Sequence, residues 1–198
     1  MFENINDVHI IGSAKELNTM ISSVDQRVQE MSNLTEQIKA FVANCGSTTF
    51  GQQYEKAVNA VSELSNSLYN KSIELNQSQR DLVNYIDRVD RFNDRPPSAL
   101  PPKNHQVTRI KVSVNTRDDR FTKETIQKVV RMLNSYCDNI SKQKAQLINE
   151  KSNIRSKWKD SQYKVYSSFI EEICRAIESG TRTLREYADY LQSKINNM

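Results

Sequence analysis

This chain of 198 residues contains little that interrupts a helix, because only four glycines and four prolines occur along its whole length. It also lacks any run of about 20 consecutive apolar residues, the length that a membrane-spanning helix requires. Sheets with many turns need more turn-forming residues than this. The composition therefore predicts an all-α protein of long amphipathic helices, with no membrane span.

Residues that usually carry catalysis or bind metals are also scarce. The two histidines, His9 and His105, lie near no cysteine, serine or acid at a suitable spacing, and the three cysteines form no Cys-x-x-Cys pair. Glycine-rich phosphate loops are missing. Adjacent acids such as Glu171 and Glu172 point in different directions on a helix. The sequence therefore predicts no enzymatic activity, no metal and no cofactor.

The net charge of +4 is small, and basic and acidic residues are interleaved along the predicted helices. Such interleaving is typical of solvated helix faces, so we expect no nucleic-acid partner. The N-terminus, residues 1–7, has neither the basic nor the apolar region of a signal peptide. We expect a cytoplasmic protein with buried free thiols, and secretion without a cleaved signal peptide is the alternative.

What the chain does contain is an internal duplication, in which position n of the first half corresponds to position n + 109 of the second. Apolar positions of the two halves coincide on both sides of a break. Leu17 coincides with Ile126 before the break, for example, and Tyr54 with Tyr163 after it. Period and register repeat together, which predicts two similar helical hairpins in tandem.

Cap and turn signals divide each hairpin into two helices. Ser13 and Glu16 form a capping-box pattern at the start of the first helix, and Thr122, with Thr125 as the alternative, caps the third. The four predicted helices cover about residues 13–43, 52–91, 122–154 and 161–195.

The segment between the hairpins, residues 93–116, differs in composition from both. Prolines at 96–97 and 101–102 cannot continue a helix and favour an extended path. Ile110, Val112 and Val114 alternate with polar residues, which predicts a short strand. The predicted organisation is a first hairpin over 1–92, a proline-rich linker over 93–116 and a second hairpin over 117–198.

Two hairpins that pack antiparallel require this linker to travel the length of the bundle. Helices of about 30 to 40 residues span about 45 to 60 Å, and about 25 extended residues reach on the order of 80 Å. We therefore expect an intramolecular pseudo-dimer, a four-helix bundle. The residues predicted at its interface are Leu17, Ile21, Val24, Leu64, Leu68, Leu75, Leu133, Ile140, Leu147, Ile173, Ile177 and Leu184.

Trp158, the single tryptophan, lies at the predicted bend between the third and fourth helices. A large ring there can cap the bundle end, and Asp160 can accept amides at the start of the next helix. With its flanking helices, this bend resembles the WXG (Trp-x-Gly) family of helical-hairpin proteins linked to type VII secretion. Asp160 replaces the glycine of the motif, whereas the corresponding bend of the first half, Thr49-Phe50-Gly51, keeps the glycine without the tryptophan.

The resemblance implies a non-enzymatic partner, adaptor or chaperone, or a co-secreted component, for a helical targeting domain of a secreted toxin or another WXG-like protein. The family's export signal, Tyr-x-x-x-Asp/Glu, is missing, since Tyr187 is followed at that spacing by Leu191 and Tyr190 by Lys194. Two alternatives remain open. They are a cytosolic coiled-coil scaffold unrelated to secretion and a membrane-surface helical protein.

Several apolar residues lie beside the main stripes and widen them. They are Met20, Leu34, Phe41, Val129, Tyr136 and Ile148. Surplus apolar surface predicts a further helical partner. The alternative, of equal weight, is that wide stripes serve a bundle core in which each helix meets two neighbours.

Overall fold

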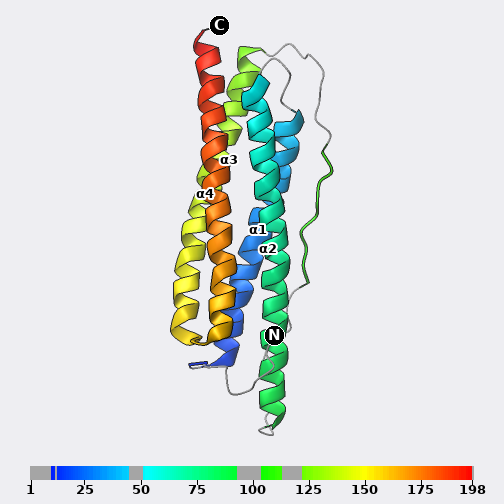
Figure 1. Ribbon diagram of the computed structural model, residues 1–198, viewed down its shortest axis with the longest axis vertical. Helices are drawn as coiled ribbons and strands as arrows, with labels where there is room; N and C mark the ends of the chain where they lie inside the picture. Colours follow the sequence, from blue (N-terminus) through cyan, green and yellow to red (C-terminus); the bar gives the residue numbers. More distant parts are fainter. Residues whose placement is uncertain (1–9, 12, 45–50, 93–103, 113–121, 198) are drawn as a thin grey trace.

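The computed structural model confirms the all-α four-helix bundle (Figure 1). It describes residues 10–11, 13–44, 51–92, 104–112 and 122–197. Its helices are α1 (Ala14–Asn44), α2 (Gly51–Phe92), α3 (Lys123–Lys157) and α4 (Ser161–Asn196). The first residues of α1 and α3, Ala14 and Lys123, correspond to each other in the duplication, so the sequence repeat is also a repeat of structure.

Each hairpin is antiparallel, and the two hairpins also run antiparallel to each other. In Figure 1, α1 ends and α2 begins at the top of the view, whereas α3 ends and α4 begins at the bottom. Between the hairpins, α2 packs on α4 along an extensive contact, and α1 packs on α3 along a slighter one. The fold is thus a dimer of hairpins made from one chain.

The core follows the predicted apolar stripes. All twelve residues predicted at the interface are buried, and duplicated pairs such as Leu75 and Leu184 are both fully buried. Burial of each such side chain stabilises the fold by about 1.5–3 kcal/mol. None of the described helices combines the length and the apolar character that crossing a membrane requires.

The helix ends use the predicted caps. The N–H of Glu16 donates to Ser13 Oγ (3.4 Å), and the N–H of Thr125 donates to Thr122 Oγ1 (3.2 Å), so Thr122 is the cap of α3. Gly51 begins α2 with a φ of 51°, a left-handed conformation that favours glycine. Thr49 and Phe50 lie outside the described residues.

Residues 104–112, which we call the strap, run extended along α1 and α2 (Figure 1). No strand is assigned to residues 110–112 of the predicted strand, and Val114 lies outside the described residues. The neighbours of the strap are helices, which offer no free backbone ladder to an extended chain. Its N–H groups bond to side chains instead.

Candidate functional site

The α3–α4 bend is a structural cap built around Trp158. The indole is 1% exposed, and its Nε1 donates to Asp160 Oδ2 at 2.7 Å. The other carboxylate oxygen of Asp160 accepts the N–H groups of Gln162 (2.8 Å) and Tyr163 (3.0 Å) at the start of α4. The rings of Tyr163 and Tyr166 lie 6.0 and 5.6 Å from the indole. Asp160 therefore holds both the helix end and the tryptophan, which a glycine at this position could not do.

A cleft of about 960 Å³ lies beside this bend, between α3 and α4. Ile148, one of the residues predicted for a partner surface, lines it and is 43% exposed. Most of the charges in its wall are basic, but Asp160 and Glu171 also face it, and Lys151 pairs with Glu171 at 3.0 Å. This mixture of charges is typical of a solvated surface.

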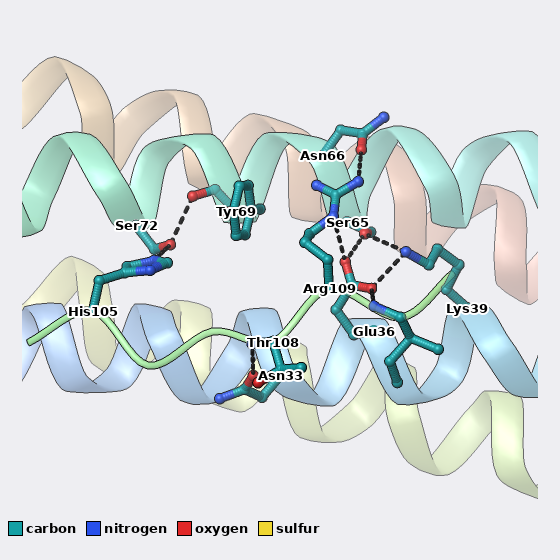
Figure 2. A network of polar contacts seen from close by, with 11 residues as sticks. Asn33, Glu36, Lys39, Ser65, Asn66, Tyr69, Ser72, His105, Thr108 and Arg109 are labelled. Carbon is teal, nitrogen blue, oxygen red and sulfur yellow. Dashed lines mark hydrogen bonds and ion pairs between the residues drawn. The ribbon is translucent and has the colours of Figure 1, made fainter. Parts of the chain in front are cut away.

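The strap is held by backbone N–H groups that donate to side chains of α1 (Figure 2). The bonds join Gln106 to Gln29 (2.8 Å), Thr108 to Asn33 (3.3 Å) and Ile110 to Glu36 (2.7 Å). Alternate residues of an extended chain lie about 6.6 Å apart, and residues three or four apart on a helix face lie about 5–6 Å apart. The two periods match closely enough for successive bonds to form.

The intervening side chains of the strap reach α2. His105 Nε2 lies 2.7 Å from Ser72 Oγ, and its ring meets the ring of Tyr69 edge-on at 5.6 Å. Arg109 lies over the same tyrosine ring at 4.7 Å and donates to Asn66 Oδ1 at 2.5 Å (Figure 2). The strap therefore bridges both helices of the first hairpin.

Glu36 is the centre of this network and is 1% exposed. Its carboxylate accepts Lys39 Nζ (2.5 Å) and Ser65 Oγ (2.5 Å) from within the hairpin, and Arg109 Nε lies 3.4 Å away (Figure 2). Burial alone would raise the pKa of Glu36, but the bonds from Lys39, Ser65 and the N–H of Ile110 outweigh burial, so its pKa is lowered. The carboxylate is therefore held in its charged form.

Asp25 is a second buried carboxylate on α1. Its Oδ2 accepts Gln29 Nε2 (2.8 Å) and Asn76 Nδ2 (2.9 Å), and the residue is 2% exposed. Burial raises the pKa of Asp25 and outweighs the opposing effect of these two bonds. Two carboxylates on one helix thus have opposite pKa shifts.

The line of contact between α1 and α3, which we call the α1–α3 seam, has two ends related by the duplication. At the closed end, Arg27 donates through Nε and Nη2 to both carboxylate oxygens of Glu150 (2.9 and 2.7 Å). Its Nη1 donates to Gln146 (2.7 Å), and Ser23 Oγ donates to Glu150 (3.3 Å). A bidentate pair of this kind fixes the geometry between the two hairpins.

At the open end, the duplication places apolar side chains where the closed end has polar ones. Tyr136 corresponds to Arg27, and Phe41 corresponds to Glu150. The result is a groove of about 480 Å³ between the helices, which we call the open groove. It is lined by Leu34, Phe41, Met132 and Tyr136, with Lys128 and Arg131 on its α3 side.

The floor of the open groove is hydrogen-bonded and its wall is charged. Tyr136 is buried, its hydroxyl lies 2.7 Å from Thr35 Oγ1, and burial raises its pKa. Met132 is 38% exposed at the surface. Lys128 and Arg131 are exposed, and neither forms an ion pair with a residue that the structure describes. The open groove therefore offers apolar contacts beside two available cations.

The residues predicted for a partner surface do not form one continuous surface. Leu34, Phe41 and Tyr136 come together in the open groove. Met20 is half-buried against the core, and Ile148 lines the cleft at the bend. Val129 does not belong to a surface, because it is 4% exposed within the core. Its burial follows from a bundle in which each helix meets two neighbours.

Sequence reasoning missed Met132, Lys128 and Arg131. A signal for this site was present in the mismatches of the duplication rather than in its matches. Met132 corresponds to Ser23 and Arg131 to Ser22, so an apolar and a charged residue replace two small polar ones.

Comparison with known protein families, with curated proteins and with solved structures finds no match to this chain. Among the described residues, no group of three or more histidine, cysteine or acidic side chains is placed to hold a metal ion. Cys137 is buried and Cys174 half-buried, both as free thiols, and Cys45 lies outside the described residues.

Proposed function

We propose that this protein is a non-enzymatic helical interaction protein of a type VII, WXG-type secretion system. It acts as partner, adaptor or chaperone, or as a co-secreted component, for a helical substrate. The resemblance of the second half to the WXG family motivates the assignment to secretion. The observation that carries the interaction role is the open groove at one end of the α1–α3 seam.

A partner of this bundle binds on its outside. The apolar stripes of the two hairpins already fill one another, as the full burial of Leu68 and Ile140 illustrates. Two separate hairpins would offer each other this interface, but here both belong to one chain. A helical substrate therefore needs another apolar surface, and the open groove supplies one.

The test is co-expression with helical targeting domains of secreted toxins and with other WXG-like proteins from the same cell. We expect a stable complex in which one copy of this 22.9 kDa chain binds one partner, measured by size-exclusion chromatography with light scattering. In a strain that lacks this chain, the partner should accumulate inside the cell. Absence of any complex, together with unchanged export, would contradict the proposal.

The second candidate is a cytosolic coiled-coil scaffold unrelated to secretion. The absence of the export pattern from the sequence favours it: Tyr187 is followed at that spacing by Leu191, and Tyr187 is itself buried in the core at 2% exposure. A scaffold that pairs its hairpins between chains would form a stable dimer or larger species. Light scattering of the pure chain distinguishes this from the closed monomer.

A further inference from the structure

We infer that the open groove binds an amphipathic helix whose apolar stripe is flanked on one side by acidic residues. This inference rests on the proposed function, because it names the chemistry of the partner at that surface. Three observations carry it: the shape and lining of the groove, the charges on its wall, and the contrast with the closed end of the same seam.

The lining suits the apolar stripe of a helix. Leu34 and Phe41 lie two turns apart on α1, and Met132 and Tyr136 lie one turn apart on α3, so the open groove is bounded by two helices along its length. Tyr136 is fixed from below by its bond to Thr35. Because the Tyr136 ring is already buried and hydrogen-bonded before binding, it loses little side-chain entropy when a helix docks.

The wall charges select an acidic partner. Lys128 and Arg131 lie three residues apart on one face of α3, and no residue lining the open groove is acidic. The α1 side carries the neutral Gln37 instead. Acidic residues are therefore expected along the side of the bound helix that faces α3.

The closed end shows why the partner comes from outside. There, Arg27 and Glu150 supply opposite charges from α1 and α3, and the seam closes on itself. At the open end both cations lie on α3, and the residue that corresponds to Glu150 is Phe41. The chain thus leaves two cations without an internal acid among the described residues.

A second copy of this chain fits the open groove poorly. Each of the four helices buries its own apolar stripe inside the bundle, so no described helix is free to dock with such a stripe. The partner is therefore a different helical segment.

The test uses two synthetic helical peptides of about 18 residues, about 27 Å long. Both carry the same leucine and phenylalanine stripe; one has glutamates beside the stripe and the other has lysines. Binding to the full chain is measured by fluorescence anisotropy. We expect the glutamate peptide to bind about tenfold more tightly than the lysine peptide, and the difference to shrink as salt is raised.

Two pairs of variants locate the binding site, because each pair makes the same change inside and outside the open groove. Gln37→Glu places an acid in the open groove, and Gln146→Glu places it at the duplicated position of the closed end. Met132→Asn and Ile148→Asn each remove an exposed apolar side chain from α3. We expect Gln37→Glu and Met132→Asn to weaken binding of the glutamate peptide by about three- to tenfold, and the control variants to leave it unchanged.

The inference is overturned if the two peptides bind equally, if neither binds, or if the open-groove variants behave like their controls. It is also overturned if the pure chain forms a dimer that Met132→Asn dissociates, since a second copy then fills the open groove. The proposed function is tested separately. If a natural helical partner binds Met132→Asn as tightly as the original chain, the proposed function stands. The open groove is then not the binding site.

Discussion

The two hairpins share helix order and apolar register but differ in what they bury. Among the described residues, the buried polar side chains other than tyrosine belong to α1 and α2, with Thr181 of α4 as the exception. In the duplication, Glu36, Lys39 and Ser65 correspond to Ala145, Ile148 and Cys174. The same backbone architecture thus carries a polar network in one copy and small or apolar side chains in the other.

The difference teaches that the polar network serves the strap rather than the pairing of helices. An extended backbone on a protein surface presents N–H groups that need acceptors. Residues of α1 supply them through Gln29, Asn33 and Glu36. The second hairpin pairs its helices as closely without such a network, so helix packing alone does not require it.

The largest expected effect comes from removing the centre of the network. Glu36→Ala leaves Lys39 buried with Ser65 as its remaining partner and deprives the strap of an acceptor. Breaking a buried pair on one side typically costs about 3–5 kcal/mol. We expect a loss of this size in the free energy of unfolding, measured in urea. A loss below about 1 kcal/mol would show that the pair behaves as a surface pair.

The matched variant transfers the second hairpin's residues to the first: Glu36→Ala, Lys39→Ile and Ser65→Cys together. Because both charges leave at once, most of the lost stability should return. The strap should nevertheless be loosened around Arg109, since the acceptor of the Ile110 N–H and the ion-pair partner of Arg109 are gone. Faster trypsin cleavage at Arg109 or Lys111, at nearly restored stability, would separate the two roles of the network.

A second difference between the copies lies at Gly180, whose counterpart in α2 is Lys71. A Cβ at Gly180 would lie 2.8 Å from Leu64 Cδ2 and 3.1 Å from Leu64 Cβ. Gly180→Ala should stabilise the helix by about 1 kcal/mol because alanine has the higher helix propensity. The added Cβ overpacks the α2–α4 contact, which should destabilise the fold by about 1–3 kcal/mol. We expect a net loss of about 1 kcal/mol. The exposed neighbour variant Ser179→Ala should show no loss, and a stabilised Gly180→Ala would mean that Leu64 moves aside freely.

The two buried carboxylates of α1 should respond to pH with opposite signs. The pKa of Glu36 is lowered in the folded state, so Glu36 contributes stability at pH values above its ordinary pKa of 4.5. This stability is lost as the pH falls through the folded-state pKa. The pKa of Asp25 is raised in the folded state, so Asp25 contributes stability at pH values below its ordinary pKa of 3.8. This stability is lost as the pH rises through the folded-state pKa. Asp25→Asn should therefore stabilise the protein at neutral pH, whereas Glu36→Gln should destabilise it.

Urea unfolding of both variants between acid and neutral pH checks this expectation. The advantage of Asp25→Asn should vanish in acid, and the deficit of Glu36→Gln should shrink there. If both variants changed the free energy of unfolding in the same direction at neutral pH, the opposite pKa shifts of Asp25 and Glu36 would be contradicted.

The smallest effect is expected at the closed end of the α1–α3 seam. The Arg27–Glu150 pair is bidentate but has side chains 24% and 22% exposed, so solvent screens it. Arg27→Ala should lower the free energy of unfolding by about 1 kcal/mol or less. The free energy of unfolding should depend more strongly on salt in the original chain than in the variant. A salt-independent loss would mean that packing of the arginine stem, rather than charge, holds this end.

The bundle was predictable because its signals are local and occur twice. Thr122 and Asp160 carry cap patterns, and the apolar register of one half repeats in the other. The surface of α1 that binds the strap was not predictable in the same way. Gln29, Asn33 and Glu36 follow the spacing of a solvated helix face, and that spacing is the same whether water or an extended chain covers it.

The candidate site lies between these cases. Leu34, Phe41 and Tyr136 stood out as apolar residues beside the stripes, and the structure brings them together. Val129 has the same pattern and is buried, because its exposure depends on how far α3 is rotated toward its neighbours. Rotation of a helix about its axis is a property of the assembled bundle, which no single stretch of sequence records.

The position of the strap in the sequence also bears on the order in which the two hairpins can fold during synthesis. The side chains of α1 and α2 that hold it, from Gln29 to Arg80, all precede it in the sequence. At about 5–20 residues per second, the ribosome needs roughly 4–16 s to add the about 80 residues of the second hairpin. During that interval the strap can already be seated along the first hairpin, pointing the growing chain back toward the end where α3 starts. The newly made hairpin then arrives in the antiparallel direction that the bundle requires.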